Sequence, residues 1–134
     1  MLTKVSIDTI LYMDRPSYKE IDRKIKQAKE AVLKNRLSFI DAVSIAADAL
    51  ELDYMIGEIS NILVDLLGEM TPKDYVGQFP PQRSYEEKIL QCDLFPFKWF
   101  SRRLGCAVYM KFAIKDEQVW LVSLHEDRKE GGEK

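Results

Sequence analysis

The sequence predicts one α+β domain, with three N-terminal helices packed on a small, mainly antiparallel sheet that ends in a C-terminal β-hairpin. Apolar residues recur at steps of three and four through the first half of the chain, which is typical of amphipathic helices. Alternation with a period of two replaces this pattern in the last third, which indicates strands. Helices followed by strands favour an α+β domain, and 134 residues suffice for one core. We therefore take residues 1–134 as a single domain.

The first helix is predicted to begin at Ser17 and to run to residue 33. Ser17 is the expected N-cap, because a side-chain oxygen ahead of an apolar repeat can accept a hydrogen bond from a free N–H group of the first turn. The apolar stripe of this helix consists of Ile21, Ile25, Ala28, Val32 and Leu33.

Two further helices are predicted before residue 70. The second covers about residues 39–50, and its small side chains permit close packing; they are Ala42, Ala46, Ala47 and Ala49. The third has Asp53 as its expected N-cap and Gly68 near its end, where glycine is favoured. Its inward side chains are expected to be Ile56, Ile59, Ile62, Leu63, Leu66 and Leu67.

The pattern is weaker between the helices and the hairpin. A turn at 71–74 is predicted to lead into a short strand at 75–79, which two prolines end. Residues 84–91 fit either a helix or a strand. Pro96 confines the aromatic run at 94–100 to a sheet edge or a bulge, because proline cannot donate a ladder hydrogen bond. The charged residues 128–134 are expected to form a frayed tail.

The best-defined element is the hairpin at 108–125. Its first strand puts Val108, Met110, Phe112 and Ile114 on one face, and its second strand is predicted to bury Trp120, Val122 and Leu124. Both sets of apolar side chains lie on the same face of the hairpin if a three-residue loop, 116–118, joins the strands. Tyr109 then lies opposite His125, and Lys111 lies opposite Ser123. A phenol, an ammonium, a hydroxyl and the only imidazole of the chain thus converge on the other face.

Charge, cysteines and hydropathy narrow the classes of function. The net charge of −2 argues against a general nucleic-acid coat, although residues 71–115 carry eight basic and four acidic side chains. That segment favours an anionic partner, or else it is a solvated surface. Two cysteines and one histidine predict neither a metal site nor a disulfide scaffold, and no cofactor is expected. Without an apolar stretch of membrane-spanning length, a cytoplasmic protein with no membrane partner is expected.

Five short motifs occur in a distinctive order. They are 42–54 (AVSIAADALELDY), 59–63 (ISNIL), 71–75 (TPKDY), 108–111 (VYMK) and 121–124 (LVSL). In this order they resemble the motility quorum-sensing regulator toxin family, whose members are RelE-like messenger-RNA interferases. The resemblance spans residues 22–127, leaves 1–20 as an N-terminal extension, and implies a RelE-like fold.

The resemblance also implies a function. Members act as toxins of type II toxin-antitoxin systems: they are ribosome-independent endoribonucleases that cut single-stranded messenger RNA, and a cognate antitoxin protein restrains them. Their active site uses two lysines, a glutamine and a tyrosine. Tyr109 matches the tyrosine and Gln91 the glutamine, whereas Gly77 and His125 occupy the two lysine positions.

On this hypothesis, the chain cleaves RNA by 2′-OH attack without a metal ion. His125 is the expected acid or base, since imidazole titrates close to neutral pH. Tyr109 is a proton donor or orients the phosphate, and Gln91 positions the substrate. The expected phosphate-binding cations are Lys111, Arg102 and Arg103.

The same residues have structural interpretations. A single histidine at a strand end is most often a surface residue, Tyr109 is a good strand former, and Lys111 suits a solvated face. The alternative function is therefore a non-enzymatic module of RelE-like fold that binds a protein partner or RNA without cutting it.

Overall fold

The computed structural model describes residues 14–127 of the chain, and side chains from residue 18 onward. The main elements in chain order are α2 (Asp14–Leu33), β1 (Leu37–Phe39), α3 (Ala42–Glu51), α4 (Ile59–Glu69), β2 (Phe95–Ser101), β3 (Cys106–Lys115) and β4 (Gln118–Glu126). Three single 3₁₀ turns lie between them: η1 (Ile56–Glu58), η2 (Pro72–Asp74) and η3 (Glu87–Ile89). The predicted tail at 128–134 and most of the predicted N-terminal extension lie outside the described residues.

The domain is α+β, as predicted, with three helices and a four-stranded mixed sheet of order β1-β4-β3-β2. Strands β2, β3 and β4 are antiparallel, whereas β1 pairs in parallel with β4. The prediction that all helices precede the sheet is wrong, because β1 lies between α2 and α3. Asn35 ends the first helix region in the left-handed conformation, with φ of 61°, and the chain then extends into β1.

The helix termini differ from those predicted. The first helix already includes Asp14, so Ser17 lies inside it and is not the N-cap. Asp41 caps α3, since its carboxylate accepts a hydrogen bond of 3.2 Å from the N–H of Ser44. Asp53 caps no helix; it is left-handed, with φ of 70°. Helix α4 continues through Gly68 to Glu69.

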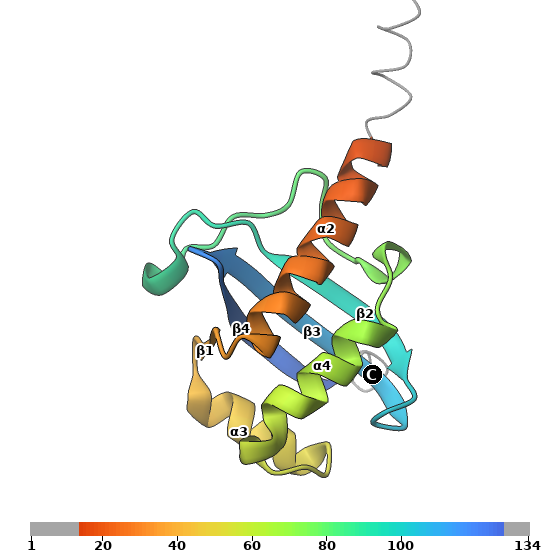
Figure 1. Cartoon of the computed structure of the whole chain (residues 1–134), viewed down its shortest axis with the longest axis vertical. Coiled ribbons are helices and arrows are strands. Elements are labelled where there is room, and N and C mark those ends of the chain that lie inside the picture. Colours follow the sequence, from red (N-terminus) through yellow and green to blue (C-terminus); the bar gives the residue numbers. More distant parts are fainter. Residues whose placement is uncertain (1–13, 128–134) are drawn as a thin grey trace, which may run out of the picture.

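Helices α2 and α4 cover one face of the sheet, which we call the helix face (Figure 1). The predicted apolar stripes of both helices are buried there, with two exceptions: Leu33 is 62% exposed, and Ile56 is only half-buried. In α3 only Ile45 and Ala49 are buried; of the other alanines predicted to pack closely, Ala42 and Ala47 are exposed and Ala46 is half-buried. The strands contribute to this core Phe95, Phe97, Val108, Met110, Phe112, Val119, Leu121 and Leu124.

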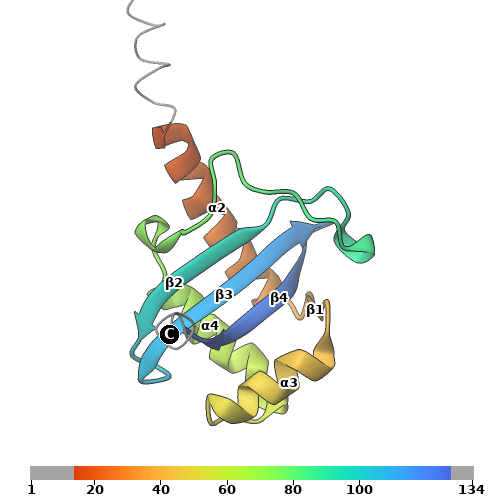
Figure 2. The ribbon, with the colours of Figure 1, turned by 180° about the vertical axis from the view of Figure 1, so that it is seen from behind.

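Residues 14–127 place no helix on the opposite side of the sheet, which we call the open face (Figure 2). The segment between α4 and β2 covers only part of it. The predicted strand at 75–79 is reduced to one bridge between Tyr75 and Phe97, and residues 84–91 form neither a full helix nor a strand but contain the turn η3. Ile89 and Leu94 from this segment pack against Trp120, while Lys115 Nζ donates to the carbonyl of Lys88 at 3.1 Å. The segment therefore covers the end of the sheet next to the β3–β4 turn.

The hairpin has the predicted pairs near its open end but a different turn. Asp116 and Glu117 form a two-residue turn, and both are left-handed, as such turns require. A β-bulge between Lys111 and Phe112 leaves Val122 as an extra residue on β4. As a result, Val119 and Leu121 face the main core in place of the predicted Trp120 and Val122, which pack on the open face.

Strand β2 forms the sheet edge, as Pro96 predicted. Pro96 does not break the edge, because its carbonyl accepts a hydrogen bond of 2.9 Å from the N–H of Val76. This contact holds the loop after η2 against the edge and beside the open face.

Candidate active site

Three side chains form a row on the open face, at the end that lies away from the β3–β4 turn. In the strand registers, Lys98 of β2 pairs with Tyr109 of β3, and Tyr109 pairs with His125 of β4. The rings of Tyr109 and His125 are stacked, with centroids 5.2 Å apart and planes 24° apart. Lys98 Nζ lies 6.0 Å from the centroid of the Tyr109 ring. The predicted pairs Tyr109–His125 and Lys111–Ser123 are confirmed.

His125 has one ring nitrogen engaged by the backbone. Its Nδ1 lies 2.8 Å from the carbonyl oxygen of Glu126. A carbonyl oxygen can only accept a hydrogen bond, so Nδ1 must carry the hydrogen in this contact. In the neutral imidazole, Nε2 then has the free lone pair. This tautomer suits His125 to accept a proton through Nε2.

Tyr109, in contrast, is suited to donate a proton. Burial raises the pKa of its phenol, because the phenolate is poorly solvated on the half-covered sheet. The hydroxyl therefore keeps its proton at neutral pH. A protonated phenol can donate a hydrogen bond or a proton, so the Tyr109–His125 pair combines a donor with an acceptor.

A cleft of about 170 Å³ opens beside Tyr109. Its wall combines three apolar side chains with two glutamines and one lysine, and its lining consists of Val76, Gly77, Gln78, Gln82, Leu94, Pro96, Tyr109 and Lys111. Tyr109 and Lys111 thus contribute to one concave surface, which His125 adjoins through the ring stack. The cleft can hold a small planar or anionic group next to the phenol.

Gly77 fits into a space that leaves no room for a side chain. A Cβ atom at this position would lie 2.5 Å from the Tyr75 hydroxyl oxygen and 2.8 Å from Cδ of Pro96. The Tyr75 hydroxyl also donates a hydrogen bond to the carbonyl of Gln78, which fixes the ring in place. The lysine of the resembled family therefore cannot be accommodated here without moving the loop.

Two of the predicted site residues lie elsewhere. Gln91 is exposed in the turn after η3, with φ of 67°, at the covered end of the sheet. Arg103 faces α4: its Nε donates to Asp65 at 2.9 Å and its backbone N–H to Glu69 at 2.7 Å. These contacts hold Arg103 on the helix side of the β2–β3 turn.

Arg102 is exposed in the same turn and acts on the same acidic residue. Burial raises the pKa of Glu69, but hydrogen bonds from Trp99 and Arg103, helped by the charge of Arg102, outweigh this effect and lower it. Arg103 is therefore held by α4, and the charge of Arg102 acts on a residue of the same helix.

Lys98 is the member of the row that the sequence-based prediction omitted. In β2, Pro96, Lys98 and Phe100 alternate with the buried Phe95 and Phe97. This period of two places Lys98 on the open face, and it was the available signal.

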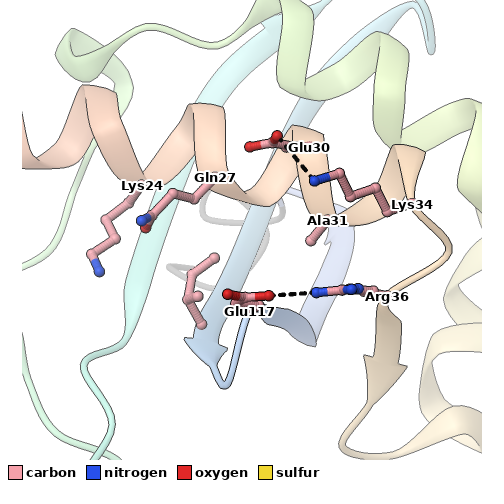
Figure 3. A pocket seen from close by; sticks show the side chains of 8 residues that line it. Lys24, Gln27, Glu30, Ala31, Lys34, Arg36 and Glu117 are labelled. Carbon is pink, nitrogen blue, oxygen red and sulfur yellow. Dashed lines mark hydrogen bonds and ion pairs between the residues drawn. The ribbon is translucent and has the colours of Figure 1, made fainter.

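A larger cleft, of about 400 Å³, lies on the helix side between α2 and the β3–β4 turn (Figure 3). Its basic side chains are paired with acidic neighbours: Arg36 with Glu117 at 2.6 Å, and Lys34 with Glu30 at 3.3 Å. Lys24 pairs with Glu20 at 3.7 Å. The smaller cleft on the open face is the better candidate for an active site, because it contains Tyr109 and Lys111 and adjoins the imidazole of His125.

Residues 14–127 contain no group of three or more histidine, cysteine or acidic side chains arranged to hold a metal ion. Within the same residues, every helix is too short or too polar to cross a membrane.

Comparison with known proteins identifies no relative: neither a protein-family model nor a curated protein sequence matches the chain. The resemblance to the motility quorum-sensing regulator toxins therefore stays a prediction.

Proposed function

We propose that this protein is a RelE-like toxin that cleaves single-stranded messenger RNA by 2′-OH attack, and that it acts in a type II toxin-antitoxin pair. The observation that supports this most strongly is the stacked pair of Tyr109 and His125, with ring centroids 5.2 Å apart, on the helix-free face of the sheet. The pair combines a proton donor and a proton acceptor beside a cleft that contains Lys111.

The proposed reaction follows from the protonation states of the two rings. Nε2 of His125 takes the proton of the ribose 2′-hydroxyl, and the 2′-oxygen attacks the adjacent phosphorus. The bond from phosphorus to the 5′-oxygen breaks, and the leaving oxygen takes the proton of the Tyr109 hydroxyl. The products are a 2′,3′-cyclic phosphate and a 5′-hydroxyl end. Solvent returns a proton to the phenolate and removes one from the imidazolium.

Lys111 supplies positive charge close to the reacting phosphate. It lies on the same strand and face as Tyr109 and lines the same cleft. An ammonium group in this place attracts the RNA backbone and offsets the charge that develops on the phosphorus oxygens. Of the three predicted phosphate-binding cations, Lys111 is the one that lines the cleft beside Tyr109, whereas Arg103 is bound to Asp65 of α4.

The test is incubation of the purified chain with a long single-stranded RNA in EDTA, followed by analysis of the product ends. Cleavage that persists in EDTA and leaves 2′,3′-cyclic phosphates is expected. Tyr109→Phe and His125→Ala, each verified as folded by circular dichroism, should both reduce it. Induced expression should arrest growth, and co-expression of the small protein encoded beside it should relieve the arrest.

One observation favours a second function, a module that binds RNA or a protein without cutting RNA. Gly77 occupies a family lysine position and cannot carry a side chain in this loop. If the purified chain binds RNA but leaves it intact while its fold is verified, the binding module is the correct function and the toxin proposal fails.

A further inference from the structure

Lys98 has a defined place beside the proposed reacting groups. It is directly opposite Tyr109 in the β2–β3 register, just as His125 is in the β3–β4 register. Neighbouring strands are about 4.8 Å apart, so the row Lys98–Tyr109–His125 places an ammonium and an imidazole on the two sides of one phenol. A phosphate over the Tyr109 hydroxyl would lie between them.

The charge of Lys98 is oriented but not strongly bound. Its Nζ lies 3.8 Å from Oδ1 of Asp127, which is near the upper limit for an ion pair, and 37% of the lysine side chain is exposed. By contrast, Arg103 is bound to Asp65 at 2.9 Å on the helix side. Asp127 therefore holds the ammonium near the Tyr109 ring, and this ion pair is weak enough for a phosphate to replace the carboxylate as the partner of Lys98.

We infer that Lys98 is a phosphate-binding residue of this site and supplies the cation that Gly77 lacks. This assignment rests on the proposed function. Negative charge on the nonbridging oxygens increases as the 2′-oxygen attacks, so a nearby ammonium stabilises the transition state more than the bound RNA. Lys98 should therefore affect kcat more than KM.

The experiment compares Lys98→Gln and Lys98→Arg with the wild-type chain in RNA cleavage. Lys98→Gln should lower kcat by about 10²–10³-fold, as removal of one transition-state charge partner does in other enzymes. Lys98→Arg retains the charge and should recover most of that loss. Lys26→Gln is the matched control, because Lys26 also pairs with an aspartate, Asp22 at 3.0 Å, but on α2. Full activity of a folded Lys98→Gln variant would overturn the inference.

A binding measurement separates this inference from the proposed function. Single-stranded DNA of the same sequence lacks the 2′-hydroxyl and cannot be cut, so its binding can be measured without cleavage, and the salt dependence of that binding reports the phosphate contacts. Loss of one contact should reduce the slope of log affinity against log salt by about 0.7 for Lys98→Gln. If wild-type protein fails to cut RNA but this slope change is found, the proposed function fails and Lys98 remains a phosphate contact. If the wild-type protein fails to cut RNA and the slope is also unchanged in Lys98→Gln, both the proposed function and the role of Lys98 are overturned.

Discussion

The two faces of the sheet differ in composition and in how they are covered. On the helix face, Phe97, Met110 and Phe112 are fully buried beneath α2 and α4. On the open face, the strand residues between them are Lys98, Tyr109 and Lys111, and the segment before β2 covers only the end near the hairpin turn. Alternation along the same three strands thus separates a face that forms the core from one that carries the polar side chains of the candidate site.

The bulge at Val122 allows the apolar residues of β4 to reach the core while the Tyr109–His125 pair is kept on the open face. The turn of two residues and the extra residue on β4 offset each other, so that Val119 and Leu121 reach the core while Tyr109 still lies opposite His125. A hairpin without the bulge but with the same turn would pair Tyr109 with Leu124, and the imidazole would leave the row.

The largest expected effect is on the open face. His125→Ala should lower RNA cleavage by about 10²–10⁴-fold, because a positioned acid or base contributes that much to rate. The urea midpoint of unfolding should change little, since the side chain is only half-buried and outside the core. Single-turnover cleavage and urea denaturation check the two parts. Comparable losses in activity and stability would mean that the faces are not separable.

The converse substitution is on the helix face. Leu66→Ala in α4 should lower the free energy of unfolding by about 2–5 kcal/mol, because Leu66 is fully buried and its truncation leaves a cavity. The rate of cleavage per folded molecule should stay close to that of the wild-type chain. Urea denaturation gives the first value, and cleavage well below the unfolding transition gives the second.

A smaller effect is expected where the loop meets the open face. Gly77→Ala should destabilise the fold by about 1–3 kcal/mol, because the new methyl group would lie within 2.8 Å of Tyr75 and Pro96 atoms. Gly77→Lys should therefore lower activity, even though it introduces the lysine of the toxin family that the sequence resembles. Increased cleavage by a folded Gly77→Lys variant would show that the loop yields easily and that this contact does not limit the site.

The smallest effect concerns buried phenols. Burial raises the pKa of Tyr54 from the usual 10 to about 12, and it raises that of Tyr75 to the same value. The folded state keeps these protons more tightly, so their contribution is complete below pH 10 and is lost as pH rises toward about 12. Urea denaturation across this range should show falling stability in the wild-type chain, and a weaker fall in Tyr54→Phe.

The same variant probes the helix side at neutral pH. In the described part of the chain, the buried Tyr54 hydroxyl has no hydrogen-bond partner. Removing it should leave stability unchanged or raise it by about 1 kcal/mol, because a buried unpaired polar group is unfavourable. A loss of stability in Tyr54→Phe would show that the hydroxyl has a partner, such as a bound water molecule.

Much of the helix face was predictable, because the steps of three and four in α2 and α4 are strong and their side chains are buried as expected. The three-residue strand β1 was missed because it is too short for a period to appear, and Phe39 was assigned to the next helix. The bulge could not be predicted either. Residues 119–122 are all apolar, so alternation does not show which of them face the core.

The candidate site was predictable where it depends on local register. Tyr109, Lys111 and His125 follow from alternation within one hairpin. The structure places Gln91 and Arg103 away from these three residues. Alternation could not predict this, because Gln91 lies in a left-handed turn and Arg103 forms an ion pair with α4. Lys98 joins the row only through pairing between β2 and β3, and the sequence gives no register for that pair.

The most direct test of the account measures cleavage of RNA in which sulfur replaces the bridging 5′-oxygen at one position. A thiolate leaves without a proton, so loss of the general acid no longer matters, whereas the base is still required. Tyr109→Phe should then cleave at nearly the wild-type rate, while His125→Ala should stay slow. If Tyr109→Phe remains as slow on the sulfur substrate as on ordinary RNA, Tyr109 is not the proton donor and the proposed division between the two rings is wrong.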